Sequence, residues 1–218
     1  MKEFLASLGQ TPLFEGLTQQ ELSGILGCLG ARPLSAGKGM PIFREGDPAV
    51  FIGIVLEGAV QVIREDYYGN RSILSHIGPR ELFGESYAFS PEETLPVSVV
   101  AAEDSRLVML DSRRITACCA NACAFHSRVI FNLLRMAAIQ NLNLHRKIQI
   151  TSQRTTRDKL MAYLLSMAKQ QGPSFRIPYD RQGLADYLEV DRSGLSVEIS
   201  KLRKEGILEC DRNLFRLL

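Results

Sequence analysis

The stretch RQGLADYLEVDRSGLSVEISKLRKEG, residues 181–206, decides how this chain is organised. It predicts two short helices joined by a tight turn, because apolar residues recur at helical spacing on both sides of the turn. Asp191 stands just before the second helix, where its carboxylate can accept hydrogen bonds from free backbone N–H groups. We therefore expect a helix pair with an inward-facing apolar stripe. The stripe comprises Leu184, Ala185 and Leu188 in the first helix and Leu195, Ile199 and Leu202 in the second.

The opposite face of the second predicted helix is short, polar and basic. Arginine and serine side chains can hydrogen-bond base edges in the major groove, so this face predicts contact with double-stranded DNA. A plain helical hairpin with a solvated polar face is the alternative, because amphipathic helix pairs occur in many functions. The residues predicted to bind DNA are Arg192, Ser193, Ser196, Ser200 and Arg203.

Short alternating runs follow the second helix, at residues 207–209 and 214–216, on either side of Asp211-Arg212-Asn213. They predict a small β-hairpin, and residues 175–178 form a further strand candidate in front of the helix pair. A helix pair followed by a hairpin is a winged helix-turn-helix, which favours DNA binding over the plain hairpin.

Composition sets wider bounds. The chain has 218 residues, of which 45% are hydrophobic, enough for one large or two ordinary domains. The net charge is only +2, but residues 151–218 hold 12 Lys and Arg against 9 Asp and Glu, which weakly favours DNA binding there. No apolar run is long enough to span a membrane, and residues 1–10 lack the apolar core of a signal peptide, so we expect a cytoplasmic protein.

From about residue 32 to residue 110 the pattern is that of short strands separated by turn signals, which predicts an all-β sandwich or barrel. Gly69-Asn70 is expected at a hairpin tip, and Thr18 with Glu21 forms a capping box for a helix in front of the β region. We place these elements in a first domain, residues 1–124. The strand runs are residues 51–56, 60–63, 73–77, 97–101 and 107–110.

Residues 125–150 predict a long helix with a seam of heptad spacing. The seam would make this helix the axis of a homodimer, with Asn141 fixing the register. A helix packed only on its own domain is the alternative, because fewer than four heptads are present. The remaining residues, 151–218, form the C-terminal domain. The seam consists of Ile130, Leu134, Ala137, Asn141, Leu144 and Ile148.

In this order of parts, the chain resembles the family of the cyclic-AMP receptor protein and the FNR oxygen regulator, the CRP/FNR family. The resemblance is carried by residues 57–60 (EGAV), 82–86 (LFGES) and 190–193 (VDRS). It implies an α+β fold: a cyclic-nucleotide-binding-like β-roll, a dimerisation helix and a winged helix-turn-helix. It also implies a homodimeric transcription regulator that binds a two-fold symmetric operator, contacts RNA polymerase and responds to a small effector in the β-roll.

One departure from the family pattern concerns the effector. In nucleotide-binding members, a Gly-Glu pair is followed about ten residues later by an Arg and then a Ser or Thr. The Gly-Glu pair is present here as Gly84 and Glu85. Leu95 and Pro96 occupy the two later positions. Burying a phosphate diester without a cation costs on the order of several kcal/mol, and Arg is the usual cation that pairs with the phosphate. We therefore expect no tight binding of cyclic AMP or cyclic GMP. Gly84 and Glu85 remain candidates for binding another, less charged effector.

Three further hypotheses are open. Cys118, Cys119 and Cys123, with His126 and Cys28, could hold a metal or iron–sulfur cluster, although small buried thiols flanked by alanine are the more common case. A cupin-like metal enzyme would need several histidines on its strands, and only His76 lies in the β region. The third hypothesis is a sensor that signals by protein contact without binding DNA.

Overall fold

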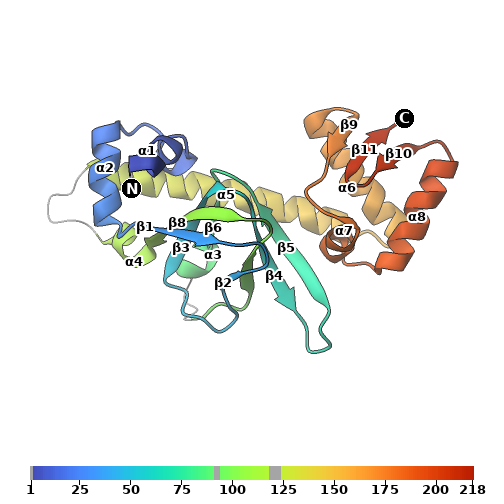
Figure 1. Ribbon diagram of the computed structural model, residues 1–218, viewed down its shortest axis with the longest axis horizontal. Coiled ribbons are helices and arrows are strands. Elements are labelled where there is room, and N and C mark those ends of the chain that lie inside the picture. Colours follow the sequence, from blue (N-terminus) through green and yellow to red (C-terminus); the bar gives the residue numbers. More distant parts are fainter. Residues whose placement is uncertain (1, 91–93, 118–123) are drawn as a thin grey trace. The chain divides into compact units, whose positions relative to one another are not determined.

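The computed structural model describes residues 2–90, 94–117 and 124–218. It divides into two compact units (Figure 1). The first comprises residues 1–65 and 74–141, and the second residues 66–73 and 142–218. The boundary between the units falls inside the longest helix, and a short hairpin segment of the β region belongs to the second unit.

The first unit begins with helices α1 (Lys2–Leu8) and α2 (Gln19–Cys28), separated by a 3-10 turn, η1 (Pro12–Phe14). Thr18 caps α2 through the predicted box, because its hydroxyl accepts from the Glu21 N–H while the Glu21 carboxylate accepts from the Thr18 N–H. These hydrogen bonds hold the pKa of Glu21 below its ordinary value. Leu22, Ile25 and Leu26 of α2 are buried.

Two four-stranded sheets follow, in the orders β1-β8-β3-β6 and β2-β7-β4-β5. Valines on facing strands, such as Val55 on β3 and Val99 on β7, fill the core between them. The predicted strand runs are confirmed, and β1, β2 and β6 are additional strands. The bounds are β1 (Arg32–Ala36), β2 (Pro41–Phe43), β3 (Phe51–Glu57), β4 (Val60–Glu65), β5 (Arg71–Ile77), β6 (Leu82–Phe83), β7 (Ser98–Ala101) and β8 (Ser105–Asp111), with a short helix α3 (Glu85–Ala88) after β6.

Helix α4 (Ser112–Thr116) leads toward α5 (Ala124–Thr151), the predicted long helix. One face of α5 buries Val129, Leu133 and Met136 in the same core as the N-terminal helices. Part of α5 is therefore anchored in the first unit, as the alternative reading of this helix expects.

The second unit carries the predicted winged helix-turn-helix. Helix α6 (Thr156–Gln171) is capped by Thr155 and ends at Gly172. A three-stranded sheet has the order β10-β11-β9, so the strand ahead of the helix pair closes the wing. The other elements are β9 (Ser174–Arg176), α7 (Arg181–Leu188), α8 (Arg192–Lys204), β10 (Leu208–Asp211) and β11 (Leu214–Leu217). Across the described residues, no helix combines the length and the hydropathy needed to traverse a bilayer.

Candidate functional site

The start of α8 is fixed by Asp191. Its carboxylate accepts a hydrogen bond from the Gly194 N–H at 2.8 Å and another from the Ser193 hydroxyl. These hydrogen bonds to the charged form hold the pKa of Asp191 below its ordinary value. The predicted N-cap is thus confirmed, and it sets the position of Arg192 in the first turn of α8.

Four of the five predicted DNA-binding residues are exposed on α8, and Ser196 is half-buried among them. Within the described part of the chain, the side chains of Arg192 and Arg203 make no hydrogen bond or ion pair, so their donors remain available. The serine hydroxyls instead donate to their own helix: Ser196 to the Arg192 carbonyl at 3.0 Å and Ser200 to the Ser196 carbonyl at 2.9 Å. Their oxygens can still accept hydrogen bonds from base amino groups.

The opposite face of α8 is the predicted apolar stripe, and it is buried without exception. Leu195 and Leu202 are fully buried, and Ile199 is 4% exposed. Helices α6 and α7 provide the support beneath, with Leu160, Leu164, Leu184 and Leu188 fully buried. The polar face of α8 is therefore held outward by an apolar seat.

An ion pair fixes the far end of α8. Arg157 at the start of α6 donates to both carboxylate oxygens of Glu205, at 2.9 and 2.5 Å. The guanidinium lowers the pKa of Glu205 from its ordinary value. Sequence reasoning missed this pair, because nothing local links two charges that lie 48 residues apart.

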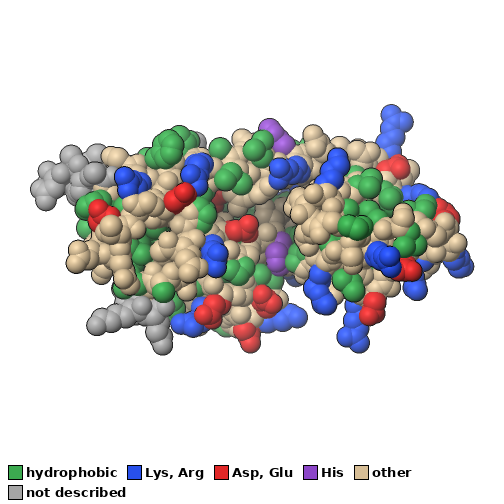
Figure 2. Space-filling view, turned by 90° about the horizontal axis from the view of Figure 1, so that it is seen from above, with side chains coloured by type: hydrophobic (Ala, Val, Ile, Leu, Met, Phe, Trp, Pro, Cys, Tyr) green, Lys and Arg blue, Asp and Glu red, His purple; other side chains and the backbone are tan. Residues whose placement is uncertain are grey.

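The wing is tied to the rest of the sheet through Asn213. Its Oδ1 accepts from Arg176 Nη1 at 3.0 Å, and its Nδ2 donates to the Ile177 carbonyl at 3.2 Å. Arg212 occupies the tip in a left-handed conformation, with φ at 51°, and is exposed. Figure 2 shows Lys and Arg side chains projecting around this C-terminal unit. Ser200, Arg203 and Lys204 line a surface hollow of about 370 Å³ on α8, whose cations suit a phosphate.

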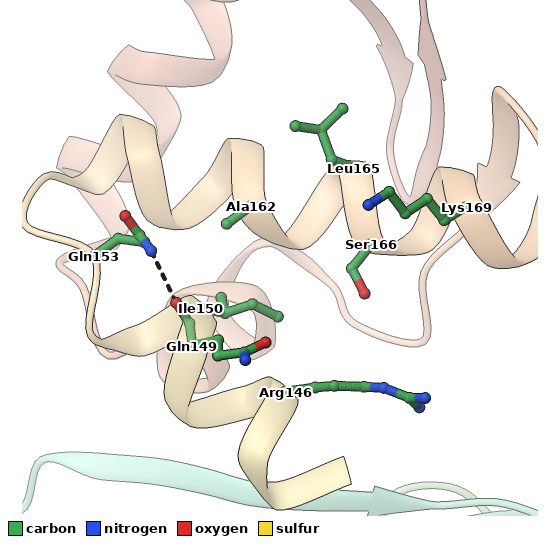
Figure 3. Close-up of a pocket in the computed structure, with 8 residues that line it drawn as sticks. All are labelled: Arg146, Gln149, Ile150, Gln153, Ala162, Leu165, Ser166 and Lys169. Carbon is green, nitrogen blue, oxygen red and sulfur yellow. Dashed lines mark hydrogen bonds between the residues drawn. The ribbon is translucent and has the colours of Figure 1, made fainter. Parts of the chain in front are cut away.

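A larger cleft, of about 440 Å³, separates the last turns of α5 from α6 (Figure 3). Arg146 lies on the α5 side, and Ser166 and Lys169 lie on the α6 side. Ile150 at its base is 6% exposed. This cleft adjoins the turn between Thr151 and Thr156.

In the first unit, the effector candidates Gly84 and Glu85 are adjacent at the start of α3. Gly84 has φ at 85°, and a Cβ there would lie 3.1 Å from the Phe51 carbonyl oxygen, so glycine is required. Glu85 is only 7% exposed, and burial raises the pKa of its carboxyl above the ordinary value. Its Oε1 accepts from the Ser86 hydroxyl at 3.1 Å, while its Oε2 is buried and has no hydrogen-bond partner among the described residues. The Glu85 side chain is therefore buried and not solvated.

Leu95 and Pro96 differ from each other in burial. Leu95 is 4% exposed, and its backbone is held by Gly46 N–H and the Asp47 carbonyl, at 2.8 and 2.9 Å. Pro96 is exposed. An apolar side chain thus lies in the protein interior at the position where the family pattern has its phosphate-binding arginine.

The heptad seam of α5 is largely unburied. Leu134 is 67% exposed and Ile148 is 60% exposed, and Ile130, Asn141 and Leu144 are exposed as well, while Ala137 is half-buried. The face of α5 that packs in the core of the first unit, with Val129, Leu133 and Met136, is therefore not the face that carries the heptad seam. Cys118, Cys119 and Cys123 lie outside the described residues, so the cluster hypothesis stays a hypothesis. Cys28 is exposed.

Comparison with known proteins matches both halves of the chain. Residues 33–122 match the cyclic nucleotide-binding domain family, and residues 158–218 match the Crp-like helix-turn-helix domain. The chain is 29% identical, over 91% of its length and 88% of the relative, to the cyclic AMP receptor protein of Thermus thermophilus. This chain belongs to the CRP/FNR family. It is a DNA-binding transcription regulator, as its helix-turn-helix indicates.

Other known proteins are similar to this chain in sequence or in fold. A CRP-like cAMP-activated global transcriptional regulator of Mycobacterium tuberculosis is 24% identical over 94% of this chain and 90% of its own. The fold is that of CooA from Carboxydothermus hydrogenoformans, solved as a mutant (TM-score 0.77, 20% identity, 96% of this chain and 93% of that one). It is also that of the c-di-GMP responsive global regulator CLP of Xanthomonas campestris (TM-score 0.76, 19% identity, 92% and 99%).

Proposed function

We propose that this CRP/FNR regulator binds a two-fold symmetric operator as a homodimer and inserts α8 into the major groove. The observation that carries the proposal is the exposed Arg192, whose side chain pairs with no described residue, on a helix whose other face is fully buried. Arg192 would hydrogen-bond a guanine edge, and Ser193, Ser196 and Ser200 would contact bases or phosphates beside it. Arg203, in the hollow on α8, would bind a phosphate.

Val197 adds an apolar contact to the same surface. It is 52% exposed, at a position where the family resemblance places an arginine in some members. An exposed valine on a recognition helix fits the methyl group of thymine. We infer that the operator of this protein differs from operators read by an arginine at that position.

The exposed seam of α5 supports dimer formation. Solvent-facing Leu134, Leu144 and Ile148 at heptad spacing are the residues that a second copy of the same helix would cover. A parallel pair of α5 helices would present the two α8 helices to half-sites one helical turn apart.

The effector would bind in the β-roll and act through its different affinity for two arrangements of the dimer. Leu95 inside the protein supports an effector other than a cyclic nucleotide, because a buried phosphate diester would find no cation there. Gly84 and Glu85 would contact the effector. The unfilled cleft between α5 and α6 would allow the angle between those helices to change.

As a transcription regulator, this protein would also contact RNA polymerase at its promoters. We further infer that it has no catalytic activity of its own, since its parts serve DNA reading and sensing. The cupin-like enzyme and the sensor without DNA binding are less consistent with the helix-turn-helix match.

A gel-shift assay with duplexes from the DNA upstream of its own coding sequence tests the proposal. We expect binding that weakens steeply as salt rises, because phosphate contacts release counterions. Lack of salt-sensitive binding to every fragment would overturn it.

Isothermal titration calorimetry with cyclic AMP and cyclic GMP tests the effector proposal separately. We expect no saturable heat at ligand concentrations of about 100 μM, since each 1.4 kcal/mol lost weakens binding about tenfold. Micromolar affinity for either nucleotide would contradict it and leave DNA binding untouched.

A further inference from the structure

A lysine on α5 is buried in the second unit. Lysines in proteins are almost never fully buried unless they are paired. Lys147 is 8% exposed. Its ammonium donates a hydrogen bond to the Ile73 carbonyl, in the hairpin segment 66–73. It also lies 4.6 Å from the ring centroid of Tyr187 and 4.0 Å from Glu189 Oε1.

Two partners of Lys147, Tyr187 and Glu189, belong to the helix-turn-helix. Tyr187 lies near the end of α7, and its ring stacks on that of Tyr179 at 4.9 Å. Glu189 is the C-cap of α7 and the turn residue before α8. Lys147 therefore joins the last turns of α5 to the segment that sets the direction of α8.

The turn held in this way has an unfavourable backbone conformation. Glu189 has φ and ψ both at 55°, a left-handed geometry that is unfavourable for a non-glycine residue. Such a conformation persists only where its surroundings fix it. Part of the support comes from Lys159, whose Nζ lies 3.3 Å from the carbonyl oxygens of Leu188 and Glu189.

We propose that Lys147 is a positioning residue for the recognition helix: it holds the turn between α7 and α8 against the end of α5 and the hairpin segment 66–73. This inference rests on the DNA-binding function proposed above. Lys147 fixes the direction in which α8 leaves the turn, and it does so from a buried position, without itself contacting DNA.

Lys147→Met tests this proposal, because methionine keeps an unbranched stem and removes the ammonium. Methionine at this position leaves no buried charge without a partner, because the Glu189 side chain is 43% exposed, so the effect should be local. The N–H groups of Glu189 and Val190 both donate to the Ala185 carbonyl, and their amide hydrogen exchange reports directly on the turn.

We expect faster exchange at Glu189 and Val190 in Lys147→Met, with unchanged exchange in the core of α6. Operator affinity should fall about 3- to 30-fold, the range for residues that act without touching the ligand. The slope of log K against log salt should stay constant, because no phosphate contact is lost. Lys147→Arg should restore part of the affinity, and Lys169→Met, at an exposed lysine of α6, is the matched control.

If amide hydrogen exchange at Glu189 and Val190 in Lys147→Met were as slow as in the wild-type protein, the inference would be overturned. Uniformly faster exchange across the unit would also overturn it, because it indicates a general loss of stability. A salt slope reduced by about one would overturn it as well, since Lys147 would then contact a phosphate. If the wild-type protein binds no DNA, the proposed function fails, and the exchange data alone judge the role of Lys147. Should Lys147→Met not fold, Tyr187→Leu removes the ring beneath the ammonium and tests the same contact.

Discussion

The recognition helix and the segment from Gly84 to Pro96 stand in contrast. On α8, four of the five polar and basic residues expected from the sequence are exposed, over an apolar stripe that is wholly buried. In the β-roll the Gly-Glu pair is kept, but the cation is replaced by Leu95, which is itself buried. The surface proposed to read DNA is retained, whereas the site that would read a cyclic nucleotide is changed.

The difference follows from what each surface must bind. Every DNA duplex presents phosphates along its backbone and base edges in its major groove, so an outward arginine on an apolar seat suits a helix that binds DNA. An effector site has no such constant partner. The buried Oε2 of Glu85, which pairs with no group in the described part of the chain, suits a neutral or cationic group that donates a hydrogen bond, which a phosphate diester does not provide.

The largest effect is expected from Leu134→Glu, which would separate the two copies and so remove the second half-site contact. Losing the second of two linked contacts lowers affinity about 10²- to 10⁴-fold. Sedimentation should show a monomer, and operator binding should weaken by that factor. Met40→Glu, at a methionine that is 53% exposed outside α5, is the control and should remain dimeric. A Leu134→Glu protein that stays dimeric would contradict the proposed interface.

A smaller effect is expected from Arg192→Ala on the α8 side of the comparison. Loss of one arginine contact to a base should cost about 1–3 kcal/mol of specific binding and relax the preference at one base pair. Competition binding with operator variants measures both quantities. Arg64→Ala, at an exposed arginine of β4, should leave them unchanged. Equal operator affinity of Arg192→Ala and wild type would remove Arg192 from the interface.

Most of the C-terminal unit could be predicted from the sequence because its signals are local. Asp191 precedes an apolar stripe of helical period, and Gly172 ends α6, so both helix limits follow from neighbours in the chain. The contacts of Lys147 were not predictable. Its carbonyl partner, Ile73, lies 74 residues away, and a lysine in a helix ordinarily faces water.

In the β region, the longer strands could be predicted but the short ones could not. Strands β2 and β6 have too few residues to show an alternating pattern, and β1 has four exposed residues out of five. Leu95 could be read as a replacement for an arginine, but its burial, and that of Glu85, depends on packing that no local pattern encodes.

The smallest effect is expected from Glu85→Gln, which sharpens the β-roll side of the comparison. Burial raises the pKa of Glu85 above its ordinary value of 4.5, so the folded state holds this proton more tightly than the unfolded state. Below pH 4.5 both states are protonated, and the site carries no penalty. As the pH rises past that value, the unfolded state loses its proton first, and the free energy of unfolding falls until the folded carboxyl is also ionised.

Glutamine does not titrate. The variant should therefore be more stable than wild type at pH 7.5, by about 1 kcal/mol, the order expected for a buried polar atom without a hydrogen bond. The gain should shrink toward zero near pH 4. Thermal unfolding of both proteins across this pH range measures it, with Glu65→Gln at an exposed glutamate as the control. Parallel stability curves for Glu85→Gln and wild type would mean that the Glu85 carboxyl is not destabilised in the folded state, and that the β-roll has no unpaired acceptor for an effector.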